Sequence, residues 1–133
     1  MALDRIDVLL NVTDVERSLG FYRELVGMHV DGTWADDEGR TRWAKLVASG
    51  GSALMLNEPE GDALTDRASR PAYRDVVVYV RMRSLGELDA IRARLTDSGA
   101  APGENSDEMY GQREFMVRDP DGYELAVCAP LGS

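Results

Sequence analysis

The sequence is poor in the residues that most often carry nucleophilic or metal chemistry, with one cysteine and one histidine in 133 residues. An internal disulfide is excluded because Cys128 has no second cysteine to pair with. Cys128 lies in an apolar run, which favours a buried thiol in a reduced compartment. A cysteine nucleophile is not indicated, because the only histidine, His29, follows a helix end in the other half of the sequence.

Long apolar runs are also missing. No stretch approaches the roughly 20 apolar residues that span a membrane, and residues 1–5 lack the basic and then apolar order of a secretory leader. We therefore expect a cytoplasmic protein without a membrane partner. Positive charge is scarce: 15 basic against 24 acidic residues give a formal net charge of -9. This charge disfavours nucleic acid and favours a cationic or neutral small-molecule partner, although it also serves solubility alone.

What the sequence does contain is an internal duplication. Two strand-like segments each lead into a helix that starts with a capping-box pattern and stops at a glycine. In the order of the chain, these matching features are strands 7–12 and 75–80, the pairs Thr13/Glu16 and Ser84/Glu87, and the glycines Gly27 and Gly99. Functional residues are therefore expected at equivalent positions of the two copies.

Each copy is expected to have the element order βαβββ. Apolar periodicity and turn residues predict a helix at 14–26 and strands at about 6–12, 28–35, 41–48 and 52–58 in the first copy. In the second copy they predict a strand at 75–82, a helix at 85–98 and three weaker strands, the last two joined by a turn at 119–122.

The expected helices are apolar on one side only. The apolar positions at helical spacing are Val15, Leu19, Tyr22 and Val26, and Leu85, Leu88, Ile91 and Leu95. Each helix should therefore cover one face of a sheet and leave the other face open. We expect an α+β fold and a single domain, 1–133, with modules at 5–58 and 73–130 and a surface linker at 59–72. Acidic groups at 36–38 and 58–66 fall in expected loops, where they could rim a binding cleft.

Both ends of the sequence resemble a known family. Residues 11–22, NVTDVERSLGFY, look like the opening of the vicinal oxygen chelate superfamily, and 119–125, DPDGYEL, are similar to its closing hairpin. The superfamily includes glyoxalase I, extradiol dioxygenases, methylmalonyl-CoA epimerase, fosfomycin-resistance enzymes and the metal-free bleomycin and mitomycin resistance proteins. The resemblance implies two paired βαβββ modules that form a curled mixed β-sheet around a cleft. It also implies a homodimer.

In the enzymes of this superfamily, histidines or carboxylates on the first and last strands of the modules hold a divalent metal. The resemblance maps those positions onto Asp7, Met55, Asp75 and Ala126. None is a histidine, and Met55 and Ala126 have no carboxylate, so two aspartates make a weak donor set. Glu124 lies two residues before Ala126 on the same strand face and is the one candidate for a displaced ligand. We therefore expect no metal and no cofactor. The aspartates equally fit solvated strand ends.

An open sheet face without a metal still suits an organic ligand. Aromatic rings stack on flat conjugated ligands, and methionine adapts to apolar ones. The candidate ligand contacts are Asp7, Leu9, Asn11, Met55, Asp75, Tyr79 and Glu124 from strand alternation, and Trp34, Trp43, Met109, Tyr110 and Arg113 from residue type and position. Each tryptophan equally fits core packing, and Arg113 equally fits a surface salt bridge.

The leading hypothesis is metal-independent binding and sequestration of a small aromatic natural product or antibiotic, as the resemblance to the resistance proteins implies. Two enzyme alternatives stay open. One is a lyase, isomerase or dioxygenase that holds a divalent metal with Asp7, Asp75 and Glu124. The other is a metal-free tailoring enzyme with Asp7 or Asp75 as general base.

Overall fold

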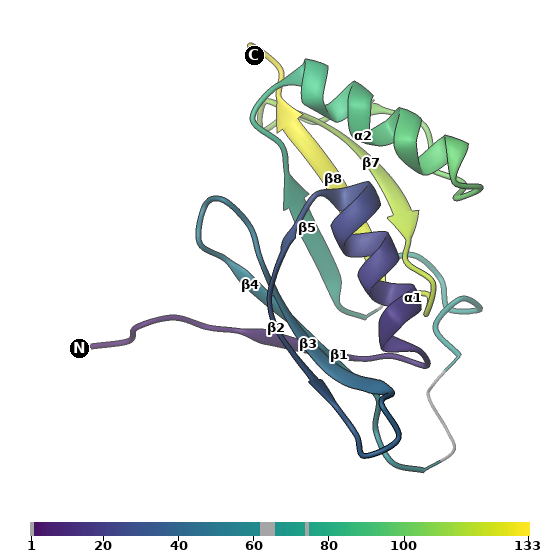
Figure 1. Ribbon diagram of the computed structural model, residues 1–133. Coiled ribbons are helices and arrows are strands. Elements are labelled where there is room, and N and C mark those ends of the chain that lie inside the picture. Colours follow the sequence, from purple (N-terminus) through teal and green to yellow (C-terminus); the bar gives the residue numbers. More distant parts are fainter. Residues whose placement is uncertain (1, 62–65, 74) are drawn as a thin grey trace. The chain divides into compact units, whose positions relative to one another are not determined.

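The computed structural model describes residues 2–61, 66–73 and 75–133. The chain divides into two compact units, Met1–Thr65 and Asp66–Ser133, and each has the same order of elements (Figure 1). Residues 62–65 of the expected linker lie outside the described residues. The rest of that linker after Asp66 belongs to the second unit. None of the helices in the described ranges has the length and apolar character needed to cross a membrane.

The first unit is a four-stranded mixed sheet with one helical segment. The strands lie in the order β1 (Val8–Asn11), β4 (Ala53–Asn57), β3 (Thr41–Val47) and β2 (His29–Ala35). β1 runs parallel to β4, and the other neighbours are antiparallel. Helix α1 (Val15–Leu19) continues into the π-helical segment η1 (Gly20–Val26) and ends at Gly27, whose φ of 96° suits a glycine.

The second unit repeats this arrangement. β5 (Val77–Arg81), β8 (Glu124–Pro130), β7 (Gln112–Arg118) and β6 (Ser106–Asp107) lie in that order, and again the first strand runs parallel to the last. Helix α2 (Leu85–Asp97) leads to Gly99, with a φ of 91°. The predicted α+β class and the mixed sheets are therefore confirmed.

Each helix contacts one face of its own sheet, α1 against β3 and β4, and α2 against β8. The side chains between helix and sheet are buried: Val15, Leu19, Tyr22, Val26, Leu10, Ala44, Leu46, Leu54 and Leu56 in the first unit, and Leu88, Ile91, Leu95, Phe115, Val117, Leu125 and Val127 in the second. Removal of this apolar surface from water is the main stabilising contribution to each unit. The predicted buried helix sides are thus confirmed except at Leu85, which is half-buried in the first turn of α2, and Cys128 is buried as expected.

The first helix does not begin as the sequence suggested. Its N-cap is Asp14 rather than Thr13, and the Asp14 Oδ1 atom accepts a hydrogen bond from the Arg17 N–H at 3.2 Å. The Glu16 carboxylate, expected to complete a capping box, instead accepts from the Thr41 hydroxyl at 2.7 Å. The expected box was wrong because two adjacent residues can cap this helix, and β3 supplies a donor for the glutamate.

The second helix is capped as predicted. The Ser84 hydroxyl accepts from the Glu87 N–H at 3.2 Å, and the Glu87 carboxylate accepts from the Arg83 N–H at 3.3 Å. We expect Ser84→Ala to lower the free energy of unfolding by about 1 kcal/mol, measured by urea denaturation. Ser84→Gly should cost only a few tenths of that, because glycine is tolerated at this position. Equal losses in the two variants would contradict the capping role.

Candidate ligand-binding faces

The open face of the first sheet, opposite α1, carries aromatic and apolar side chains. We call it the tryptophan face and define it as Leu9, Asn11, Trp34, Trp43 and Met55. Strand register places Leu9 on β1 beside Met55 on β4. Asn11 lies in the next row, two strands away from Trp43 on β3. Trp34 on β2 lies directly opposite Trp43. All five were sequence candidates, and the structure brings them onto one face.

The two tryptophans differ in exposure. Trp43 is half-buried, with its ring beside Gly32, whereas Trp34 is 59% exposed. Polar groups on this face include an amide pair, in which Asn57 Nδ2 donates to Asn11 Oδ1 at 3.1 Å, and Lys45, which lies beside Met55 and pairs with Asp31 at 3.7 Å. The face therefore combines exposed aromatic surface with a fixed amide, which suits a flat ligand with a polar edge.

The open face of the second sheet carries phenols and carboxylates. Register gives three rows across β5, β8 and β7, which are Val77–Glu124–Arg118, Tyr79–Ala126–Met116 and Arg81–Cys128–Glu114. Tyr73 and Tyr110 also reach this face. The Tyr73 hydroxyl lies 3.1 Å from Met116 Sδ, and the Tyr110 hydroxyl donates to the Glu114 carboxylate. We call Tyr73, Tyr79, Tyr110, Glu114 and Met116 the tyrosine face.

Two of these phenols are held in their neutral form. The hydrogen bond to Glu114 is the main reason that the pKa of Tyr110 lies above its ordinary value of 10. Burial, together with the Glu114 charge, raises the pKa of Tyr73 above the same value. Tyr73 also has a positive φ of 61°, unusual for a tyrosine, and its N–H donates to both Glu124 oxygens at 3.1 and 3.2 Å. The phenols are therefore hydrogen-bond donors at neutral pH.

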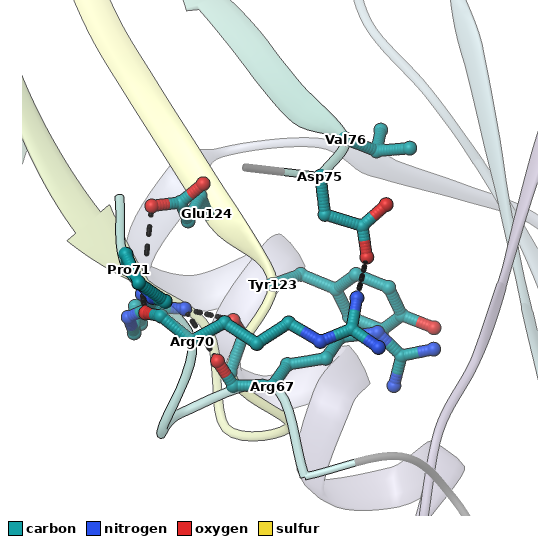
Figure 2. A pocket seen from close by; sticks show the side chains of 9 residues that line it. Arg67, Arg70, Pro71, Asp75, Val76, Tyr123 and Glu124 are labelled. Carbon is teal, nitrogen blue, oxygen red and sulfur yellow. Dashed lines mark hydrogen bonds and ion pairs between the residues drawn. The ribbon is translucent and has the colours of Figure 1, made fainter. Parts of the chain in front are cut away.

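A small cavity of about 140 Å³ lies at the edge of the second unit (Figure 2). Figure 2 shows the Arg70 side chain extended across it to Asp75, with which it forms an ion pair. The Arg67 guanidinium stacks 4.0 Å from the centre of the Tyr123 ring. Asp75 is thus occupied by an arginine rather than aimed at an open site. The lining combines three arginines, Arg67, Arg70 and Arg118, with two carboxylates, Asp75 and Glu124.

The residues at the metal-ligand positions do not fit a divalent metal. Asp7 forms an ion pair with Arg5 at 3.1 Å, and Asp75 pairs with Arg70. Met55 supplies no oxygen, and the displaced candidate Glu124 already accepts from Tyr73 and lies 3.4 Å from Arg118. Across the described ranges, no group of three or more histidine, cysteine, aspartate or glutamate side chains is placed to hold a metal ion.

Two sequence candidates lie away from the tyrosine face. Arg113 alternates to the helix-covered side of β7, where its guanidinium makes two hydrogen bonds to Asp107, at 2.7 and 3.1 Å. This salt bridge lowers the pKa of Asp107. Met109 is fully exposed in the turn before β7. The salt-bridge alternative for Arg113 is therefore the one that the structure shows.

Three residues of the tyrosine face were missed in the sequence. Glu114 and Met116 alternate with the buried Phe115 and Val117, and this two-residue period was the signal that could have found them. Tyr73 has no such signal, because it lies in a segment without apolar periodicity.

The family model of the Glyoxalase/Bleomycin resistance protein/Dioxygenase superfamily matches residues 3–127. A search of curated proteins gives no match. TnmS3, an antibiotic binding protein from Streptomyces sp. CB03234, has a TM-score of 0.70 and 24% identity over 98% of each chain. TioX from Micromonospora sp. ML1 has a TM-score of 0.70 and 22% identity over 95% of each chain.

An enzyme is also among the similar structures. Lactoylglutathione lyase from Agrobacterium tumefaciens has a TM-score of 0.66 and 17% identity, over 97% of this chain and 96% of that one. At these identities the structural likeness shows the fold alone, and the fold is shared by binding proteins and enzymes. The match over nearly the whole length establishes the family: this chain belongs to the glyoxalase/bleomycin resistance protein/dioxygenase superfamily.

Proposed function

We propose that the protein binds a small planar aromatic molecule, such as an aromatic antibiotic, stoichiometrically and without a metal. The observation that supports this most is the Trp34–Trp43 pair, adjacent across two antiparallel strands with Trp34 more than half exposed. Large aromatic side chains usually pack in a core. A tryptophan pair that is partly exposed on a sheet face therefore offers a surface on which a flat ligand can stack.

The surroundings of the pair suit recognition of such a ligand. Leu9 and Met55 lie side by side in the next row and offer apolar, adaptable contacts. The Asn11 and Asn57 amides bond to one another in the same row as the two tryptophans and form a polar edge beside them. TnmS3, which has the same fold, is described as an antibiotic binding protein, so this fold can serve the proposed function.

Binding is favoured over catalysis by the state of the two aspartates. A general base needs a carboxylate oxygen that can reach the substrate proton. Asp7 and Asp75 each form an ion pair with an arginine, Arg5 and Arg70, so each carboxylate is already engaged within the chain. The metal-dependent alternative has a donor set that does not fit. We therefore propose sequestration rather than turnover.

The test is a tryptophan-fluorescence titration with planar aromatic antibiotics. We expect saturable quenching in the parent protein and at least about tenfold weaker binding in Trp34→Ala, which corresponds to about 1.4 kcal/mol. Trp34→Phe should keep most of the affinity, because it keeps a ring. Both variants should unfold at the parent temperature, since Trp34 is exposed. A flat titration across a broad set of aromatic antibiotics would count against the proposal.

We also propose a homodimer. Within its own unit, β1 pairs only with β4 and β5 only with β8, so each has one edge open. Leu3, Ile6 and Val76 near these strands are exposed apolar residues. Exposed edges and apolar side chains are commonly covered by a second subunit. Light scattering on a size-exclusion column should give twice the chain mass of 14.6 kDa. The mass of a single chain would refute the dimer.

A further inference from the structure

We infer that the tyrosine face of the second unit is a binding site for a protonated organic amine, with Glu114 as its counter-ion. The site lies within one unit and stands whether or not the tryptophan face binds an aromatic ligand. The inference rests on a buried carboxylate that has no cationic partner among residues 2–61, 66–73 and 75–133, on exposed phenol rings around it, and on an arginine that already contacts one of those rings.

Glu114 is the buried carboxylate in question. Glu114 is 5% exposed. In the described part of the chain, its carboxylate accepts a side-chain hydrogen bond only from the neutral Tyr110 hydroxyl. Glu124, on the same face and equally buried, is different, since it lies beside Arg118 and accepts from the Tyr73 N–H. A buried carboxylate is costly unless a cation or several donors neutralise it. Glu114 therefore has a charge that an ammonium ion would neutralise.

The rings around Glu114 suit a cation as well. Tyr79 is 43% exposed and Tyr110 is 56% exposed, and the Tyr110 hydroxyl donates to the Glu114 carboxylate. The Tyr73 ring reaches Met116, two residues from Glu114 on β7. The faces of aromatic rings attract ammonium groups, and a thioether accommodates the attached alkyl or aryl group. Carboxylate, rings and thioether together describe the recognition of a primary amine on an organic body.

Arg81 shows that a cation is accepted here and also competes with one. Its guanidinium lies 5.5 Å from the centre of the Tyr79 ring and 3.8 Å from Cys128 Sγ. Arg81 on β5 and Glu114 on β7 both lie opposite Cys128, so strand β8 lies between them. Arg81 therefore does not neutralise Glu114 directly, but it repels a bound ammonium ion. Removal of the Arg81 charge should strengthen amine binding.

The experiment uses the full chain with ¹³C-methyl methionine, followed by NMR. Among its six methionines, Met116 lies on the tyrosine face and Met55 on the tryptophan face, so one spectrum reports on both sites separately. The probe is benzylamine, which is protonated at pH 7, and benzyl alcohol is its neutral counterpart. We expect benzylamine to shift the Met116 methyl signal saturably at concentrations up to about 10 mM, and benzyl alcohol to shift it far less.

Variants decide the role of Glu114. Glu114→Gln, close in shape, should weaken benzylamine binding by about tenfold or more, and Arg81→Gln should tighten it by about twofold to fivefold. Glu104→Gln, an exposed acid of the same unit, is the matched control and should change nothing. If Glu114→Gln does not fold, the Arg81→Gln result and the alcohol comparison still decide the matter.

Three results would overturn the inference. They are equal binding of benzylamine and benzyl alcohol, unchanged affinity in a folded Glu114→Gln, and weaker rather than tighter binding in Arg81→Gln. A Met55 shift without a Met116 shift would also overturn it, while leaving the tryptophan face as a binding site. Failure of the two proposals is therefore distinguishable in the same spectrum.

Discussion

Glu58→Gln should lower the free energy of unfolding by about 2 kcal/mol, because the buried Glu58 carboxylate accepts hydrogen bonds from two arginines and a backbone N–H. The Glu58 side chain is 5% exposed at the end of β4. Its Oε1 atom accepts from the Val15 N–H at 2.9 Å, the first donor of α1. Its Oε2 atom accepts from Arg40 Nε at 2.8 Å and Arg42 Nη1 at 2.9 Å. Glutamine keeps the shape, but it removes the negative charge that both arginines share and leaves Arg42 with only its longer ion pair to Asp36, at 3.7 Å.

The effect should depend on pH. Burial alone would raise the pKa of Glu58, but the hydrogen bonds from Arg40 and Val15 and the charges of Arg40 and Arg42 outweigh it and lower the pKa below the usual 4.5. A lowered folded-state pKa gives stabilisation that is fully present above the unfolded-state value and is lost as the pH falls through the folded-state value. The difference in the free energy of unfolding between the parent protein and Glu58→Gln should therefore narrow below about pH 4.5.

Urea denaturation at pH 7 and at several acidic pH values measures both effects. Glu60→Gln is the matched control. Glu60 lies two residues after Glu58 and is exposed, so its substitution should lower the free energy of unfolding only slightly. Equal unfolding free energies for Glu58→Gln and Glu60→Gln would contradict this role of Glu58. A difference in unfolding free energy between the parent protein and Glu58→Gln that grew as the pH fell would also contradict it.

Arg118→Met should destabilise the second unit by about 3 kcal/mol, because Arg118 satisfies several backbone carbonyls at once. Its Nη1 atom donates to Arg67 O at 2.9 Å and Gly122 O at 2.7 Å, and its Nη2 atom donates to Arg70 O at 2.8 Å. Gly122, with a φ of 83°, leaves no room for a side chain, since a Cβ atom there would lie 2.7 Å from Ala68 N. Arg118 thus holds the segment 66–70 against the turn before β8.

The measurement is limited trypsin digestion beside thermal unfolding. Without Arg118, cleavage after Arg67 should accelerate well beyond the change in global stability, because that segment opens locally. Arg113→Met is the control, since Arg113 lies on the same strand but forms an exposed pair with Asp107. We expect a smaller loss there and no faster cleavage at residues 66–70. Unchanged digestion in Arg118→Met would show that other contacts hold the segment.

Much of the fold could be predicted because its signals are local. The glycines Gly27 and Gly99 end their helices where expected, and helix and strand limits agree to within a few residues. The start of α1 could not be predicted, because Glu58, distant in sequence, bonds its first N–H. The same residue, assigned in the sequence to an acidic loop at a cleft rim, is instead buried.

The candidate sites were predictable to the extent that they follow strand alternation. That pattern correctly grouped Leu9, Asn11 and Met55 on the open face of the first sheet. The Trp34–Trp43 pair depends on hairpin register, which residue type alone does not specify. Tyr73 reaches the tyrosine face through hydrogen bonds to Glu124 and Met116, which are distant from it in the sequence. Such contacts leave no trace in local periodicity.

The most direct test of the central claim, metal-independent binding without turnover, is equilibrium dialysis with a planar aromatic antibiotic in the presence of EDTA or of added zinc and manganese. Mass spectrometry of the recovered ligand completes the measurement. We expect the same dissociation constant under all conditions and a chemically unchanged ligand. Loss of binding in EDTA, or conversion of the ligand into a product, would contradict the claim and indicate one of the superfamily's enzymes.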